Sequence, residues 1–273
     1  MPDAVENTSE ELTPKKSSEQ IFEQEVDEGL GALHLPLHRL FISAFGAGLE
    51  LGLSLLFISI IRTLGTENTT NPVALELLAA ASSSFGFIVV VLGRSELFTE
   101  QTTLAILPLL SGKSSLGEVA RLWTTVYIGN LLGASASAYI IVTIGPALRD
   151  VNTQALHHIA STIVDHPAWI ILLSGVVAGW LMGLVSWLVA ASRDTISQIV
   201  IIWLFTGAIG LGHLHHSILG TTEVLGGVFS HSGTTLAGFW HFLLWATIGN
   251  AIGGAGFVAL LKFGHARPDE SSN

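Results

Sequence analysis

The sequence predicts an all-α membrane protein whose six transmembrane helices form two inverted three-helix repeats. Of its 273 residues, 49% are hydrophobic and only 12% are charged, whereas soluble domains carry about 25% charged residues. Six apolar stretches of membrane-spanning length follow one another, and a six-residue motif recurs after 120 residues. Most of the chain is therefore expected to lie in lipid.

The six spans are placed by length, because a hydrocarbon core of about 30 Å needs roughly 20 apolar residues per helix. A shorter apolar piece, Thr102 to Leu110, is expected to be a half-helix. The fifth span contains an interruption. The spans are expected at about residues 40–61, 73–92, 118–145, 168–191, 196–229 and 236–263.

Two tails flank a six-span domain at residues 39–264, whose repeats are expected at about 39–145 and 168–264. Residues 1–38 carry a net charge of -7, out of -10 for the whole chain. Within them, apolar residues at helical spacing and a possible cap at Ser17 and Gln20 predict an amphipathic helix from Ser17 to Leu33. We expect residues 1–16 to be disordered and residues 265–273 to form a short tail.

Lysine and arginine set the expected orientation, since they are enriched in cytoplasmic connections. With the N-terminus in the cytoplasm, only Arg62 and Arg149 fall outside, and both termini are cytoplasmic. The basic residues on the cytoplasmic side are then Lys15, Lys16, Arg39, Lys113, Arg121, Arg193, Lys262 and Arg267.

The internal repeat is carried by Ile128 to Gly133 in the third span and Ile248 to Gly253 in the sixth. The first and fourth spans repeat a glycine spacing of four, at Gly48 and Gly52 and at Gly179 and Gly183. Each half has three spans, so the second half must enter the membrane from the opposite side. Both motifs contain a mid-span amide, Asn130 or Asn250, which either forms interhelical hydrogen bonds or lines a pore.

The second element of each half is interrupted by polar residues at matching positions, Gly93 to Gln101 and Gly210 to Ser217. Non-helical backbone at membrane depth is tolerated only inside protein or beside a cavity. Paired broken helices in inverted halves therefore predict a substrate site near the midplane of the bilayer.

These residues resemble the formate/nitrite transporter family of pentameric, aquaporin-like anion channels. The similarity covers roughly residues 20 to 267. It rests on Glu96-Leu97-Phe98-Thr99 in the first break, on His216-Ser217-Ile218 in the second, and on both Gly-Asn pairs.

The resemblance implies a prokaryotic plasma-membrane channel for small monovalent weak-acid anions, assembled as a homopentamer. It implies that Thr99 and His216 face each other in the pore, with His216 donating a hydrogen bond or a proton. The apolar constrictions would be Leu97, Phe98, Phe87 and Ile209. We expect no enzymatic activity, cofactor or metal, and no nucleic-acid partner, since the chain offers no basic face.

The sequence also departs from the family pattern. Many members place a lysine near the start of the fourth span, where this chain has Ile163 to Pro167, and Ser83 stands where a phenylalanine is common. In the first break, Arg94 and Glu96 are expected to form a structural pair. Glu50 in the first span is a candidate for a pore or a subunit-interface role.

Parts of the sequence are also compatible with two other functions. A neutral-solute channel of the water or glycerol type would suit the topology, but the two Asn-Pro-Ala boxes of aquaporins are absent and Asn71-Pro72 is expected in a loop. The cluster from His213 to His216 could indicate a haem or metal oxidoreductase, but only one such cluster occurs. His157 and His158 are expected in a solvated loop.

Overall fold

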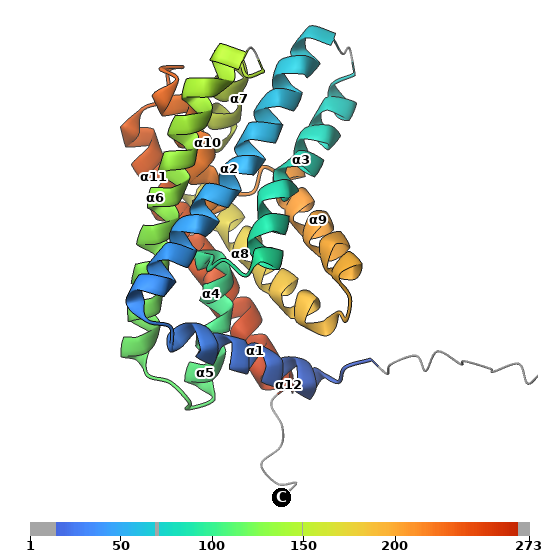
Figure 1. Cartoon of the computed structure of the whole chain (residues 1–273), viewed down its shortest axis with the longest axis vertical. Coiled ribbons are helices and arrows are strands. Elements are labelled where there is room, and N and C mark those ends of the chain that lie inside the picture. Colours follow the sequence, from blue (N-terminus) through green and yellow to red (C-terminus); the bar gives the residue numbers. More distant parts are fainter. Residues whose placement is uncertain (1–14, 69–70, 149, 267–273) are drawn as a thin grey trace, which may run out of the picture.

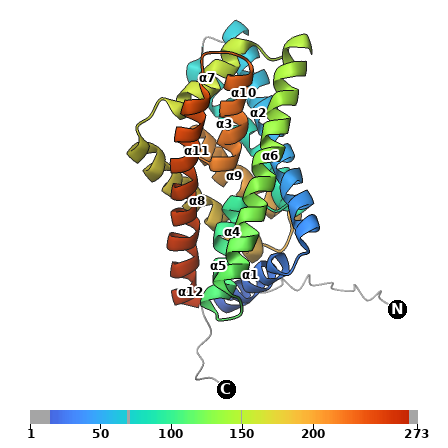
Figure 2. The same ribbon diagram turned by 90° about the vertical axis from the view of Figure 1, so that its left-hand side faces the viewer.

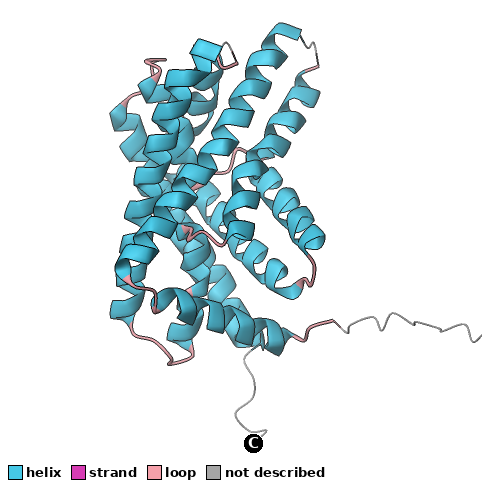
Figure 3. Ribbon diagram, in the orientation of Figure 1, coloured by secondary structure: helices cyan, strands magenta, loops and turns pink. Residues whose placement is uncertain are grey.

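The computed structural model describes residues 15–68, 71–148 and 150–266, and every regular element among them is helical. Figure 3 shows this all-helical architecture. Most of residues 1–16, for which disorder is expected, lie outside the described ranges. The C-terminal tail beyond Ala266 also lies outside them. The helices are α1 (Ser18–Leu33), α2 (Leu37–Asn68), α3 (Pro72–Gly93), α4 (Phe98–Leu104), α5 (Ile106–Leu110), α6 (Leu116–Leu148), α7 (Thr153–Val164), α8 (Ala168–Ala191), α9 (Thr195–Leu211), α10 (Ser217–Phe229), α11 (Leu236–Ala251), the π-helical η1 (Ile252–Ala259) and α12 (Leu260–Ala266).

The described helices include five continuous stretches long and apolar enough to cross a bilayer: 37–65, 72–93, 116–148, 168–191 and 236–266. The shorter α9 and α10 together make up the interrupted fifth span. The expected half-helix at Thr102 to Leu110 starts earlier, at Phe98, and is divided into α4 and α5.

Side-chain caps explain where several helices begin. Asn71 accepts a hydrogen bond from the amide of Ala74, with Pro72 in the first turn of α3. The prediction that Asn71-Pro72 lies in a loop is confirmed for Asn71, the extended cap residue, and wrong for Pro72, which is the first residue of α3. Asp194 caps α9 in the same way through the amide of Ser197.

Helix α1 forms as predicted, with both hydrogen bonds of the Ser17 and Gln20 capping box present. Its apolar side lies against the rest of the molecule, since Phe22 and Val26 are buried. Figure 1 shows α1 crossing one end of the bundle beside α5 and α12, while α7 lies at the opposite end. We call these the α1 end and the α7 end.

The two halves are inverted. Helix α2 runs from the α1 end to the α7 end, whereas α8 starts after α7 and runs back. Figure 2 shows α6 and α11 running along the bundle in opposite directions. The glycines explain how each half packs: a Cβ at Gly48 would collide with the carbonyl of Asn130, and one at Gly179 with the carbonyl of Asn250. Only glycine permits this close approach of α2 to α6 and of α8 to α11.

Candidate functional site

The two helix breaks have the same backbone geometry. After α3, Arg94 has a left-handed φ of 57°, and after α9, His213 has a left-handed φ of 47°. In each case the next amide reaches back to a carbonyl five residues earlier: Ser95 to Val90 and Leu214 to Ile209, both at 3.0 Å. This pattern is the Schellman ending of an α-helix. The chain therefore leaves both helices in the same way and becomes free to turn.

Asn130 and Asn250 hold the two breaks by equivalent sets of three hydrogen bonds. The Asn130 oxygen accepts from the amide of Phe98 at 2.8 Å, and its nitrogen donates to the carbonyls of Ala44 at 2.7 Å and Glu96 at 2.9 Å. Both asparagines are completely buried. Of the two alternatives left by the sequence, the interhelical hydrogen bonds are present in the structure.

In the second half, the Asn250 oxygen accepts from the amide of Ser217 at 2.8 Å. Its nitrogen donates to the carbonyls of Gly175 and His215, both at 2.9 Å. The bonded backbone atoms around the two breaks are thus offset by 119 residues, which makes Leu97 the counterpart of His216.

The structure brings Thr99 and His216 together, with the Thr99 Oγ1 atom 2.9 Å from the His216 Nε2 atom. The pair is sealed from solvent, because Thr99 is 0% exposed and His216 2% exposed. The ring of Phe87 lies edge-on to the imidazole at a centroid distance of 5.0 Å.

The amide of Leu219 donates to the Nδ1 atom of His216 at 3.1 Å, so His216 caps the start of α10. A nitrogen that accepts a hydrogen bond carries no proton, which leaves the proton of the neutral ring on Nε2. The imidazole therefore points an N–H group at Thr99.

The four expected constriction residues lie in one apolar cluster around this pair. Phe87, Leu97, Phe98 and Ile209 are all at least 95% buried. Phe98 also packs edge-on against Tyr127 of α6, at a centroid distance of 4.8 Å. Sequence reasoning missed Leu219, which belongs to the same cluster and lines a cavity next to Ile209.

A cavity opens toward the α7 end beside the second break. Its apolar wall includes Ile209 and Leu219, and its polar wall was not predicted as a site from the sequence. The available signal was a set of isolated charged residues within otherwise apolar spans. This polar wall consists of Arg62, Glu76, His213 and Glu223.

A second cavity opens toward the α1 end beside the first break, lined by Glu28, Arg94, Glu96, Glu100 and Gln101. The expected Arg94 and Glu96 pair is wrong. Arg94 lies 3.6 Å from Glu28 of α1, while Glu96 accepts a hydrogen bond from Gln101 at 2.6 Å. The left-handed turn at Arg94 directs its side chain outward, where it is 80% exposed.

Helix α1 packs over this end through a buried carboxyl group. Both oxygens of Glu25 lie 2.9 Å from the hydroxyl of Ser186 on α8, and the residue is 1% exposed. Burial, offset in part by the Ser186 hydrogen bond, raises the pKa of Glu25 to about 8.

The clustered histidines point to different partners. His213 faces Glu76, and His216 faces Thr99. His215 bonds to Ser174 through Nδ1 at 2.9 Å and to the carbonyl of Ile163 through Nε2 at 3.0 Å. No group of three or more potential metal ligands converges within the described ranges. The loop expected around His157 and His158 is wrong, because both residues lie in α7.

Glu50 lies on α2 rather than at either helix break. Its side chain on α2 is partly buried, and its Oε2 atom has no hydrogen-bond partner within the described chain. The structure therefore leaves its role as a prediction.

Similar proteins agree with this architecture. The Formate/nitrite transporter family model matches residues 19–264. The chain is 32% identical to the inner membrane protein YfdC of Escherichia coli, over 84% of this chain and 73% of that protein. It is 30% identical to the nitrite transporter NirC of Salmonella typhimurium, over 81% of this chain and 80% of that protein.

Among solved structures, an FNT family ion channel superposes with a TM-score of 0.81 and 27% identity, covering 91% of this chain and 99% of the other. A pentameric formate channel with formate bound has the same fold, with a TM-score of 0.70 and 23% identity over 83% of this chain and 96% of the other. By its family match, its relatives and its fold, the chain belongs to the formate/nitrite transporter family.

Proposed function

We propose that this protein is a channel for small monovalent weak-acid anions of the formate and nitrite type, and acts by transport rather than catalysis. The observation that carries the proposal is the sealed contact between Thr99 Oγ1 and His216 Nε2, 2.9 Å long. It lies within an apolar cluster between cavities that open toward opposite ends of the bundle. Such a site can receive a small polar solute and admit little else.

His216 acts as a neutral hydrogen-bond donor rather than as a proton donor. Protonating Nδ1 would break its bond from the Leu219 amide and place a cation at the positive end of the α10 dipole. A bare anion at the bilayer centre costs at least about 2.5 to 3.5 kcal/mol. The Nε2–H group and the Thr99 hydroxyl offset part of this cost for an anion, and they can also form hydrogen bonds with its neutral conjugate acid.

The proposal includes the orientation of the protein in the membrane and its oligomeric state. The α1 end carries Lys113, Arg121, Arg193 and Lys262 in or beside its helix ends, so we assign it to the cytoplasm. Both termini then lie in the cytoplasm, and the α7 end faces outward. We assign the protein to the plasma membrane of a prokaryotic cell, as a homopentamer like the formate channel that shares its fold.

A proteoliposome flux panel tests this function. Purified protein should pass formate and nitrite faster at acidic pH, because the neutral acid becomes more abundant. Hydrosulfide, acetate and lactate define the selectivity. The replacement Thr99→Val should slow the flux, and His216→Phe should slow it further or abolish it while the protein stays folded, because the hydrogen-bond donor is lost.

Three results would contradict the proposal. Water or glycerol passing at all pH values, with no formate or nitrite flux, would indicate a neutral-solute channel. A Soret band in the purified protein would support the haem alternative. Unchanged flux of every substrate in His216→Phe would remove His216 from the mechanism.

A further inference from the structure

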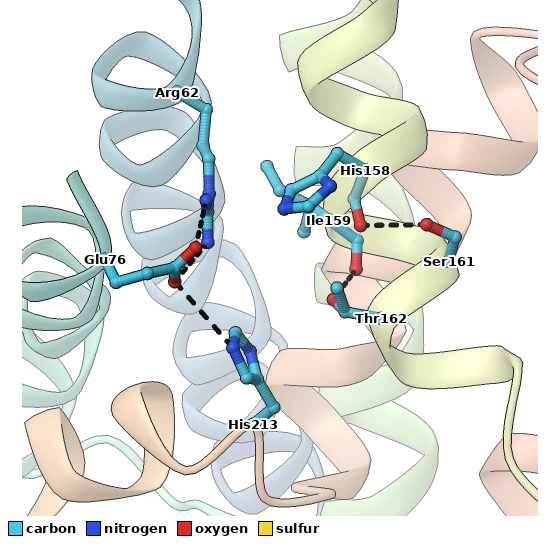
Figure 4. A network of polar contacts seen from close by, with 7 residues as sticks. All are labelled: Arg62, Glu76, His158, Ile159, Ser161, Thr162 and His213. Atoms are coloured by element: carbon cyan, nitrogen blue, oxygen red, sulfur yellow. Dashed lines mark hydrogen bonds and ion pairs between the residues drawn. The ribbon is translucent and has the colours of Figure 1, made fainter. Parts of the chain in front are cut away.

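An ion pair of fork geometry stands at the edge of the α7-end cavity. The Nη1 and Nη2 atoms of Arg62 on α2 each lie 2.7 Å from one oxygen of Glu76 on α3. Figure 4 shows the two side chains meeting end to end. A guanidinium presents this pair of parallel donors to any planar group with two oxygen acceptors. Glu76 therefore occupies the place that a small carboxylate would take.

Arg62 is buried and its donors are incompletely used. Its side chain is 9% exposed, and its Nε atom has no hydrogen-bond partner within the described chain. An unpaired buried donor is unfavourable. The protein thus keeps a guanidinium at a cavity wall without satisfying it fully, which indicates a ligand group rather than a purely structural one.

Glu76 has a second nitrogen-bearing neighbour, the imidazole of His213. The Nε2 atom of His213 lies 3.7 Å from Glu76 Oε2, and the two side chains are 43% and 38% exposed. The left-handed φ of 47° at His213 turns the side chain toward α3, as Figure 4 shows. Glu76 is more exposed than Arg62, so the carboxylate is the partner that can move.

Other titratable groups near His213 are Glu223 of α10, which lines the cavity, His158 with its neighbour His157 on α7, and His215, which lies beside His166. Burial and the charge of Arg62 lower the pKa of His158, so this ring resists protonation. His213 lines the cavity, and its side chain is 43% exposed.

We propose that Arg62, Glu76 and His213 form a proton-dependent anion-loading site at the outer mouth of the pore. A small planar anion with two oxygen acceptors replaces Glu76 on the Arg62 guanidinium when protonated His213 takes the Glu76 carboxylate. The inference rests on the proposed transport function and names its preferred substrates. Carboxylates and nitrite fit the fork, whereas hydrosulfide has a single acceptor atom and does not.

Uptake of formate into bacterial cells expressing the full chain tests the site, with KM and maximal rate measured at external pH 5.5 and 7.5. Glu76→Gln removes the internal competitor, and should lower KM at pH 7.5 by about tenfold, the worth of one charge-assisted hydrogen bond. His213→Gln should raise KM at pH 5.5 and leave it unchanged at pH 7.5. The maximal rate should change little in both variants.

Arg62→Lys keeps the charge and removes the fork. It should raise the KM for formate and nitrite about tenfold or more while leaving that for hydrosulfide unchanged. The matched control is His231→Gln, because His231 also has a left-handed φ, 53°, and does not line this cavity. It should behave as wild type.

The outcomes separate this site from the function itself. If wild-type protein passes no formate, the proposed function fails. If wild type passes formate and both Glu76→Gln and His213→Gln keep its KM at both pH values, the loading site alone is refuted. Those two variants decide the matter even where Arg62→Lys does not assemble.

Discussion

The two broken helices share a scaffold and differ in chemistry. At both breaks a left-handed residue ends the helix and a buried asparagine fixes the next half-helix by three hydrogen bonds. At the residue before each half-helix, however, the first half has Leu97, which makes no side-chain cap, and the second has His216, which caps α10. The repeat thus fixes a half-helix in the same way in both halves, but only the second half has a polar side chain, His216, at the residue before it.

The cavities beside the breaks differ as well. The α1-end cavity is lined by three glutamates and one arginine, and α1 borders it through Glu28, Gly31 and Ala32. The α7-end cavity holds the Arg62 and Glu76 pair with His213. The geometry that the two halves share therefore belongs to the fold, whereas the residues that carry the proposed functions lie where the two halves differ.

The largest expected effect tests the shared scaffold. Asn130→Ala and Asn250→Ala should each destabilise the protein by about 3–6 kcal/mol, because each leaves several buried polar groups without partners at about 1–3 kcal/mol apiece. The measurement is thermal unfolding of the detergent-solubilised protein. A large loss of stability for one variant and none for the other would show that the two asparagines are not equivalent.

The buried carboxyl group of Glu25 at the α1 end predicts that the docking of α1 on the bundle depends on pH. Glu25 has a pKa of about 8 when docked and an ordinary value of 4.5 when exposed. Below both values it is protonated in either state, so docking is strongest there. As the pH rises from about 4.5 to 8, docking should weaken by about 1.4 kcal/mol per unit.

A spin label reports this docking directly. The chain contains no cysteine, and a side chain at Gly31 on α1 would meet open space, so Gly31→Cys gives one specific label. Its mobility should increase between pH 5 and 8. In Glu25→Gln, which cannot ionise, the mobility should stay low throughout. A label equally mobile at every pH in both proteins would contradict the prediction.

The smallest expected effect tests the close packing of α2 against α6 and of α8 against α11. Gly48→Ala and Gly179→Ala should each cost about 1–2 kcal/mol, since overpacking against a carbonyl outweighs the better helix propensity of alanine. Gly46→Ala is the matched control, because a Cβ there meets nothing within 4 Å. Equal melting temperatures for all three variants would argue against close packing at the repeated glycines.

Much of the fold could be predicted from local signals. Hydrophobic runs place the spans, glycines with polar residues mark the breaks, and the Ser17 and Gln20 pattern gives the start of α1. The candidate pair of Thr99 and His216 followed from the family resemblance, and the structure places the two side chains in contact. Helix ends were less accurate: α6 extends from Leu116 to Leu148, beyond the expected 118–145.

The sequence by itself determined that this protein lies in a membrane, repeats itself and interrupts one helix in each half, because each of these properties is written in short stretches of chain. Only the tertiary structure decided that Asn130 and Asn250 form hydrogen bonds with the backbone of the two breaks. It also decided that the His216 proton lies on Nε2 and that Arg94 pairs with Glu28. It also joined Arg62, Glu76 and His213 from three separate elements. Such partnerships depend on how distant segments pack, and no local pattern specifies them.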